Sequence, residues 1–542
     1  MNRSTAIRLG NLLRVELERG RSQMRIAGHP RPYFLSYLLR HDEEWRIEAK
    51  FGALTVDGHE TRRNCLADVR VGSYRNDQVR SGGLEDNSTD VESYGMLALP
   101  VDGPGDGLQH GIWQLTEARY REAIDDLLRR RAAELSYLDE SRRLPSFERR
   151  SAIEDVRFRA LPALDQDAAR KLARRASAEM RRYPFIRDGA VKISAVNALR
   201  IFVSSEGSFI VECRPYRAVD YDVWYLSPQG TSLSKTRSWF VTDPNELPDL
   251  AAVKRDIKAT YRRLDALAKA PVIRSFSGPV LLDPKPAGLL IHEAIGHRLE
   301  GNRLRSAGEG QTFRDSVGQQ VLPEGVTVRD DPSMAHFEGR SLVGHYVYDD
   351  EGVPAGNAPL ITDGVLEGFL TSRTPAGARH HSNGHGRSAH HARAMSRMGV
   401  TIVQAKDGLG GDELFRAFVE EIRAQEVPWG IRIIDASGGE TSTDSYDFQA
   451  FLGQIDCAAR VYPDGRQELV RGVDFVGTPL NAVRGIIAAG RRMEVDNAWC
   501  GAESGYVPVT TISPSLLVEE LELQQKPSRQ VTQFAYPMPW QK

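Results

Sequence analysis

The sequence predicts an α+β protein, with an N-terminal α/β domain that has long helices and a β-rich C-terminal domain that carries a distorted helix. The chain has 542 residues, which is too long for one compact core. Apolar residues recur at helical spacing in the first half, whereas the second half is glycine-rich and strand-like. We therefore divide the chain into residues 1–262, with a helical insert, and residues 263–542.

The first domain is expected to begin with a helix and then strands that have one polar face. The helix starts near Thr5 and gives way to a loop around residues 28–32. Residues 45–56 alternate like a strand with a glycine interruption, and residues 66–72 repeat the alternation. Residues 82–92 are rich in Gly, Asp, Asn and Ser, which predicts a surface loop.

The helical insert follows. Residues 118–143 form the clearest helix, because apolar side chains recur there among arginines and acids. Three arginines at residues 129–131 lie near acidic residues, which favours a solvated helix face over a nucleic-acid contact. The later elements of this domain are expected to be a helix over 167–182, strands over 191–196, 199–204 and 209–214 with a hairpin between the last two, and a helix over 243–268.

The C-terminal half is organised around the segment His292-Glu293-Ala294-Ile295-Gly296-His297. The zinc-peptidase helix H-E-x-x-H places its histidines four residues apart on one face, but here they are five apart. A regular helix would turn the second imidazole roughly 140° away from the first. A single-turn π-bulge, or a kink at Gly296, would bring the rings together. We therefore predict a bulged or kinked metal-binding helix.

This residue set suggests hydrolysis. Two neutral imidazoles suit a divalent metal, and Glu293 can take a proton from metal-bound water. The alternative is an amphipathic core helix with two unrelated histidines. A catalytic zinc site usually has three protein ligands, so a third must come from elsewhere. The sources are downstream acids, the cysteines and a histidine-rich run: Cys65, Cys213, Cys457, Cys500, His380, His381, His385, His390 and His391.

Two of the cysteines stand in different contexts. Cys457 lies in an apolar stretch that reads as a strand, where cysteine is usually a small buried hydrophobe. Cys500 precedes Gly501-Ala502-Glu503-Ser504-Gly505, a turn-like stretch that can present a thiolate to a cavity. The histidine-rich run is interpreted mainly as a polar loop, with His385 the example of a residue that could touch substrate or metal.

Bulk composition excludes several classes of protein. The formal net charge is −2 and no long block of lysines and arginines occurs, which argues against nucleic acid as the main partner. Four widely spaced cysteines form no disulfide framework, as expected in a reducing compartment. The N-terminus lacks the apolar core of a signal peptide, and no apolar run reaches membrane-spanning length. We therefore expect a cytoplasmic location and no membrane partner.

Several motifs in order resemble the TldD/PmbA peptidases, historically called modulators of DNA gyrase. They are Ser277-Gly278-Pro279-Val280, the segment from His292 to Gly301, Asp349-Asp350-Glu351-Gly352-Val353-Pro354, Cys500-Gly501, Pro508 and Pro514. The resemblance implies that His292, His297 and Cys500 hold Zn²⁺ and that Glu293 is catalytic. It also implies a chamber formed by two subunits that admits unfolded or extended peptides. The subunits would be a homodimer, or a heterodimer with a PmbA-like homologue that lacks the metal motif.

The chain departs from the family pattern at two places. A Pro-x-Pro-Arg-Met loop is replaced by Ala394-Met395-Ser396-Arg397-Met398, which should be less rigid without its prolines. After Cys500, Thr510 and Ile512 stand where the family has glycines, and their bulk would narrow the path of a substrate. Neither change touches the presumed ligands, and both bear on substrate preference.

The function predicted from the sequence is zinc-dependent cleavage of unfolded or extended peptides, in which Glu293 acts as general acid and base. Arg397 is a candidate oxyanion partner because of its charge and loop position. The alternatives are a non-catalytic peptide-binding or assembly subunit, in which the metal only stabilises the fold, and a gyrase-linked regulator. The near-neutral charge disfavours the DNA-binding form of that regulator.

Overall fold

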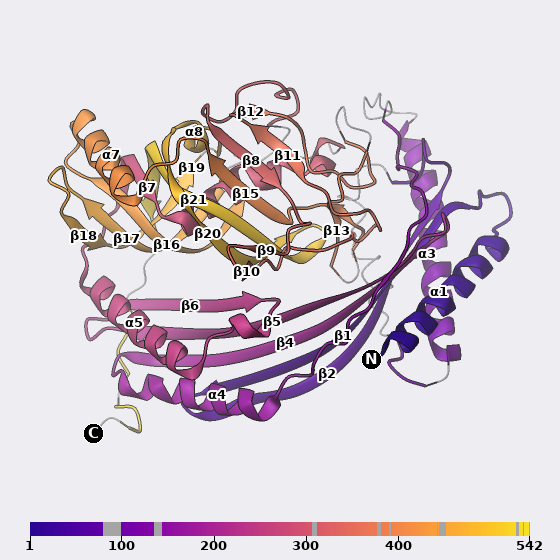
Figure 1. The fold of residues 1–542 in the computed structure, drawn as a ribbon, viewed down its shortest axis with the longest axis horizontal. Helices are drawn as coiled ribbons and strands as arrows, with labels where there is room; N and C mark the ends of the chain where they lie inside the picture. The colour runs from indigo at the N-terminus through magenta and orange to yellow at the C-terminus, as the bar shows by residue number, and fades with distance from the viewer. Residues whose placement is uncertain are drawn as a thin grey trace.

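The computed structural model contains two large β-sheets, each covered by helices (Figure 1). The first half of the chain forms one sheet and the second half forms the other, and the C-terminal tail returns to the first half, where the N–H of Val531 donates to the carbonyl of Gly230. Within the described ranges, no helix is both long and apolar enough to span a membrane. The loop expected at residues 82–92 lies outside the described part of the chain. The structure describes residues 1–79, 99–103, 105–134, 144–305, 312–376, 381–389, 392–441, 443, 451–477, 479–526, 531–534 and 536–540.

The N-terminal half forms a six-stranded sheet of long, curved strands in the order β2-β1-β4-β5, with β3 and β6 both paired to β5 (Figure 1). All pairings are antiparallel except that of β3 with β5. The glycine that interrupts the predicted strand over 45–56 lies in the turn between β1 and β2, where Phe51 and Gly52 have positive φ. The strands are β1 Pro32–Lys50, β2 Ala53–Val71, β3 Glu154–Arg157, β4 Ile186–Ser204, β5 Phe209–Leu226 and β6 Ser232–Val241.

One strand prediction for this sheet was wrong. Residues 191–196 and 199–204 were expected as two strands, but both belong to the uninterrupted β4. Asn197 lies between the two predicted strands, where its amide donates to Pro162 O and its oxygen accepts from Arg217. Tertiary partners thus satisfy a polar side chain in the middle of a strand. The hairpin expected between residues 204 and 209 joins β4 to β5.

The helices of this half pack on the two ends of the long strands. Helices α1 and α3 share an apolar core with one end of the sheet, and α4 and α5 share another core with the other end (Figure 1). Helix α3 begins earlier than predicted, and residues 135–143 of the expected helix are not described. The helices are α1 Arg3–Gln23, α3 Gly105–Glu134, α4 Gln166–Glu179 with its extension η2 Met180–Arg182, the short turn η3 Pro244–Glu246, and α5 Leu250–Lys269.

The C-terminal half forms an eleven-stranded sheet, in which β7 pairs with both β16 and β21. These contacts close β21, β19, β17, β16 and β7 into a ring around the largest apolar core. Two short ribbons, β9–β10 and β13–β14, lie outside this sheet. The strands are β7 Ser275–Leu282, β8 Val326–Asp330, β9 His336–Phe337, β10 Arg340–Ser341, β11 Ala358–Thr362, β12 Val365–Leu366, β13 Gly386–Arg387, β14 Met395–Ser396, β15 Val400–Ala405, β16 Gly430–Thr441, β17 Phe451–Val461, β18 Gln467–Val470, β19 Val473–Gly477, β20 Ile486–Ala502 and β21 Gly505–Gln525.

Few helices accompany this sheet, as the sequence predicted for a β-rich half. Helix α7 covers part of the sheet with Leu414, Phe418 and Ile422. The helical elements are α6 Pro284–Ile291, η4 His292–Gly296, η5 His297–Leu299, η6 Gly301–Arg305, α7 Gly411–Ala424 and α8 Pro479–Arg484.

Helix α5 packs on the N-terminal sheet, and the next element is β7 of the other sheet. The predicted division after residue 262 therefore falls inside α5. We propose that the two domains divide between α5 and β7, at residues 270–274, because no regular element continues across that segment.

Candidate metal centre

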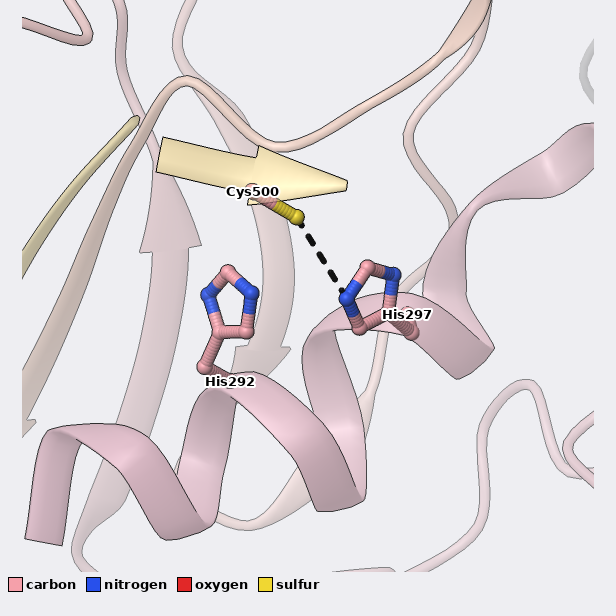
Figure 2. Close-up of side chains that lie close together, drawn as sticks. All are labelled: His292, His297 and Cys500. Carbon is pink, nitrogen blue, oxygen red and sulfur yellow. Dashed lines mark hydrogen bonds between the residues drawn. The ribbon is translucent and has the colours of Figure 1, made fainter. Parts of the chain in front are cut away.

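Helix α6 changes its winding at the histidine motif. After Ile291 the chain forms a π-turn over His292–Gly296 and then a 3₁₀ turn over His297–Leu299. The N–H of His297 donates to the carbonyl of His292, five residues back, which is the hydrogen bond of a π-turn. This wider turn confirms the predicted bulge and brings both imidazoles to one side of the helix, with ring centroids 4.9 Å apart (Figure 2).

Gly296 does not kink the helix, but its missing side chain leaves room for a neighbouring residue. Its φ of −53° and ψ of −59° are helical, so the kink offered as the alternative to a bulge does not occur. A Cβ atom at this position would collide with the side chain of Met398. The glycine therefore lets the π-turn pack closely against the buried Met398.

The third donor is the thiol of Cys500, which lies far from the histidines in the sequence but close to them in space. Cys500 was expected beside a turn, but it lies within β20, where it pairs with Val507 of β21. The hairpin turn follows two residues later, with Gly505 at φ +87°. Cys500 Sγ is 3.4 Å from His297 Nε2, and one ligand atom from each of the three residues lies within 4.8 Å of the others (Figure 2).

This donor set fits zinc. Two imidazole nitrogens and one thiolate are typical zinc ligands, and bond lengths of about 2.0–2.3 Å place tetrahedral ligand atoms about 3.3–3.8 Å apart. The three atoms already lie near that spacing, so small side-chain adjustments suffice. Three protein donors leave a fourth position open, as in catalytic zinc sites. Within the described residues, no other group of His, Cys, Asp or Glu brings three ligand atoms as close.

The electrostatics of the site favour the ionised thiol. Burial by itself would raise the pKa of Cys500, but His297, His292 and Arg397 hold this pKa well below its usual value. Burial likewise opposes protonation of His297, yet Cys500 and Glu300 raise the pKa of this imidazole to about 10. The sulfur is therefore held as a thiolate, the form that binds metals.

Glu300 is a functional residue that the sequence analysis did not single out. Its buried carboxylate lies 3.3 Å from His297 Nδ1, on the side of the ring opposite Cys500. Arg303 binds the same carboxylate at 2.7 Å, and Arg397 lies 3.3 Å from it. Burial alone would raise the pKa of Glu300, but His297 and the two arginines lower it to about 2. The sequence could have identified Glu300 as a partner of His297, because residues three positions apart lie on one face of a helix.

Replacing Glu300 with glutamine is expected to weaken zinc binding about 10- to 100-fold, because a carboxylate that accepts the second ring N–H orients a histidine ligand and raises its basicity. Competition with a chromophoric chelator would measure the affinity. Glu503→Gln is the matched control, since Glu503 also pairs with Arg303, at 2.9 Å, but has no contact with His297. Unchanged zinc affinity in a folded Glu300→Gln protein would contradict this role.

The three donors and Glu293 line one cavity of about 510 Å³. Its walls come from α6 and the π-turn, from residues 436–441 of β16, and from residues 496–502 of β20. The Glu293 side chain lies against Gly439, where an added Cβ would come within 2.7 Å of Glu293 Oε1. Within the described residues, the Glu293 carboxylate has no hydrogen-bond or ion-pair partner. It is therefore available to groups that enter the cavity.

Arg397 does not face this cavity. Its fully buried guanidinium donates to the carbonyl oxygen and sulfur of Cys500 and to Ser504 Oγ. The oxyanion role suggested by the sequence was wrong, because the side chain lies behind Cys500. Thr510 and Ile512 are also fully buried and do not line the cavity, so their bulk does not narrow it as expected.

The other candidate ligands lie elsewhere. His385 is buried and sits between Asp330, at 3.1 Å, and Asn383, so it has a structural role. His381 is exposed and contacts Glu148. Cys457 is buried in β17, as predicted for a strand cysteine. His380, His390 and His391 lie outside the described residues, and Cys65 and Cys213 belong to the N-terminal sheet.

Comparisons with known proteins find metalloproteases among the relatives of this chain. Residues 275–525 match the family model described as the PmbA/TldA metallopeptidase C-terminal domain. A metalloprotease from Archaeoglobus fulgidus is 32% identical over 44% of this chain and 51% of its own length. A metalloprotease from Methanocaldococcus jannaschii is 30% identical over 60% of this chain and 67% of its own length. A protein from Saccharolobus solfataricus named a zinc metalloprotease TldD homolog is 25% identical over 51% of this chain and 58% of its own length.

The chain thus spans about half to two thirds of the length of these curated relatives. A solved structure, TldE from Thermococcus kodakarensis, has a similar fold with a TM-score of 0.60 at 13% identity. This likeness covers 95% of the present chain and 99% of the TldE chain, so both sheets belong to a known architecture.

Proposed function

Because the chain belongs to the TldD/PmbA family, we propose that it is a zinc-dependent peptidase that cleaves unfolded or extended peptides. One observation carries the proposal. The sulfur of Cys500 meets His292 and His297 across more than two hundred residues of sequence, on the wall of a cavity that also holds the carboxylate of Glu293, which has no partner among the described residues. A purely structural metal site would need neither the cavity nor this carboxylate.

His292, His297 and Cys500 would hold the zinc ion, which when bound lowers the pKa of water and polarises a carbonyl. Glu293 takes the proton of the attacking water and later passes it to the leaving amine, as a general base and then a general acid. The absence of a side-chain partner among the described residues leaves both of its oxygens able to accept a proton. Glu300 fixes the tautomer of His297, because its carboxylate faces Nδ1 and leaves Nε2 toward Cys500.

An extended peptide suits the shape of the site. Residues 436–441 of β16 line the cavity and pair with β17 on one side only, since β7 pairs with residues 431–433 alone. In the described part of the chain, the other edge of residues 436–441 has no partner strand. A peptide in extended conformation can add to such an edge through main-chain hydrogen bonds. Strands inside the sheets of a folded protein are already paired, so this mode of binding favours unfolded or extended chains as substrates.

The proposal includes a dimer, either of two identical chains or with a PmbA-like homologue. Its support is the fold shared with TldE, together with the complete donor set in this chain, which would make it the catalytic subunit. We also propose a cytoplasmic location, in keeping with four cysteines that are all free thiols.

Removing the metal tests the function. The purified protein is expected to contain zinc by elemental analysis and to cleave quenched fluorescent peptides that are unfolded. A chelator should abolish cleavage, and added zinc should restore it, because the donors remain in place without the ion. Bound zinc without cleavage of any unfolded peptide would instead indicate the non-catalytic peptide-binding subunit.

A further inference from the structure

The cavity has a charged end that lies away from the metal ligands. Lys285 and Asp496 both line it. Lys285 precedes His292 by seven residues along α6, which corresponds to about 10 Å of helix. Asp496 precedes Cys500 by four residues along β20, which corresponds to about 14 Å of strand. An extended peptide covers that distance in three or four residues.

Asp496 shares the cavity face of β20 with Cys500. Side chains alternate along a strand, so residues 496 and 500 point to the same face. The neighbouring Asn497 points the other way, where its amide donates to Phe240 O and Ser341 O. Helix α6 packs beside Asp496, since Gly288 leaves room for Thr511, the strand partner of Asp496 on β21.

The other charges at this end are already paired. Lys235 lies 2.7 Å from Asp435 and 2.5 Å from Asp456, and Lys285 lies 3.7 Å from Asp435. Within the described residues, Asp496 has no hydrogen-bond or ion-pair partner. Arg237, which also acts on Asp496, pairs with Asp256 at 3.3 Å. Each nearby cation thus has another carboxylate as its partner, and Asp496 is left without an ion pair among the described residues.

The half-buried position of Asp496 carries an energetic cost. Burial raises the pKa of this carboxyl, which means that its charged form is incompletely solvated. A cation placed beside it would offset that cost with a charge-assisted hydrogen bond. Among the described residues no cation lies within ion-pair distance of Asp496, because the nearest, Lys285, pairs with Asp435 at 3.7 Å. The place beside the carboxylate is therefore open to a bound molecule.

We infer that Asp496 binds a cationic group of the peptide substrate, an ammonium or a guanidinium, three or four residues from the bond that is cleaved. This inference rests on the proposed peptidase function and adds a substrate preference to it. The cation has two sources, the free amino terminus of a short peptide or the side chain of lysine or arginine. Asp496 is thus a specificity-determining residue of the cavity.

Binding to the zinc-loaded Glu293→Gln protein tests the inference without turnover. Fluorescence anisotropy would compare unfolded decapeptides that carry the label at the C-terminus. One set is acetylated and has a single lysine placed at successive positions, a second is neutral and has a free amino terminus, and a third is neutral and acetylated. We expect peptides from the first or second set to bind at least tenfold more tightly than the third, and the better set identifies the source of the cation.

Substitutions then assign the preference to Asp496. Asp496→Asn should remove the tenfold difference, and Lys285→Met should enlarge it, because it removes the nearest competing cation. Glu494→Gln is the matched control, since this exposed acid lies on the same strand outside the cavity and should leave the preference unchanged.

Equal binding of all three sets, absence of peptide binding, or a preference that persists in Asp496→Asn would overturn the inference. Cleavage by the wild type is scored separately, so failure of the peptidase function is distinguishable.

Discussion

Glu293→Gln is expected to lower kcat/KM for peptide cleavage by a factor of about 10² to 10⁴ while the protein keeps its zinc. Glutamine has the shape of glutamate but cannot accept the proton of the attacking water. The side chain lies against Gly439 in the cavity, so a residue of equal size should leave the packing unchanged. Steady-state kinetics on a quenched unfolded peptide, together with elemental analysis for zinc, would measure both quantities.

Glu420→Gln provides the matched control for this variant. Glu420 is exposed on α7, and the same chemical change there should leave kcat/KM unaltered. A Glu293→Gln protein that cleaves at the wild-type rate would remove Glu293 from the mechanism. In that case, hydrolysis would have to proceed without this residue as its base.

The second large effect is expected from Cys500→Ala, which should lower zinc affinity by more than about a hundredfold and abolish cleavage. The loss exceeds that expected for Glu300→Gln because a direct ligand is removed and only two imidazoles remain. The substitution also takes the thiolate away from Arg397, whose guanidinium lies 3.3 Å from it. Zinc titration, peptide cleavage and thermal unfolding of the variant would separate these consequences.

Cys457→Ala is the corresponding control. Cys457 is another buried strand cysteine, but it lies in β17 and outside the metal cavity. The Cys457→Ala protein should lose some folding stability because of the small cavity that the substitution leaves, and its zinc content should be unchanged. If the Cys500→Ala protein is folded and binds zinc as tightly as the wild type, the donor set of the centre is wrong.

The distorted helix could be predicted from local sequence alone. His292 and His297 are five residues apart, and at that spacing two side chains on a regular α-helix cannot face one ion. A widened turn therefore followed from the spacing and the chemistry together. The π-turn over His292–Gly296 confirms that argument. The contact between Glu300 and His297 could have been predicted in the same way, because the two residues are only three positions apart in the sequence.

Other features depended on contacts that no local pattern encodes. The strand β4 runs through Asn197 because Pro162 and Arg217 satisfy its amide. Cys500 lies in a strand and not in the turn that follows it, since β21 pairs with β20 up to Ala502. Arg397 has the charge of an oxyanion partner but is buried behind Cys500.

The fold class, the family resemblance, the two candidate metal-binding imidazoles and the carboxylate beside them could all be predicted before any coordinates, because they depend on residue types at short and fixed spacings. The residues alone left several sources open for the third donor and the family resemblance pointed to Cys500, but the fold is what brings its sulfur to the imidazoles. Cys500 reaches His297 through the long β20–β21 hairpin, and Asp496 faces the same cavity with no ion-pair or hydrogen-bond partner in the described part of the chain. Strand pairing sets the distance from the Cys500 sulfur to the imidazoles and places Asp496 at the cavity. Residue types at short spacings do not specify which strands pair.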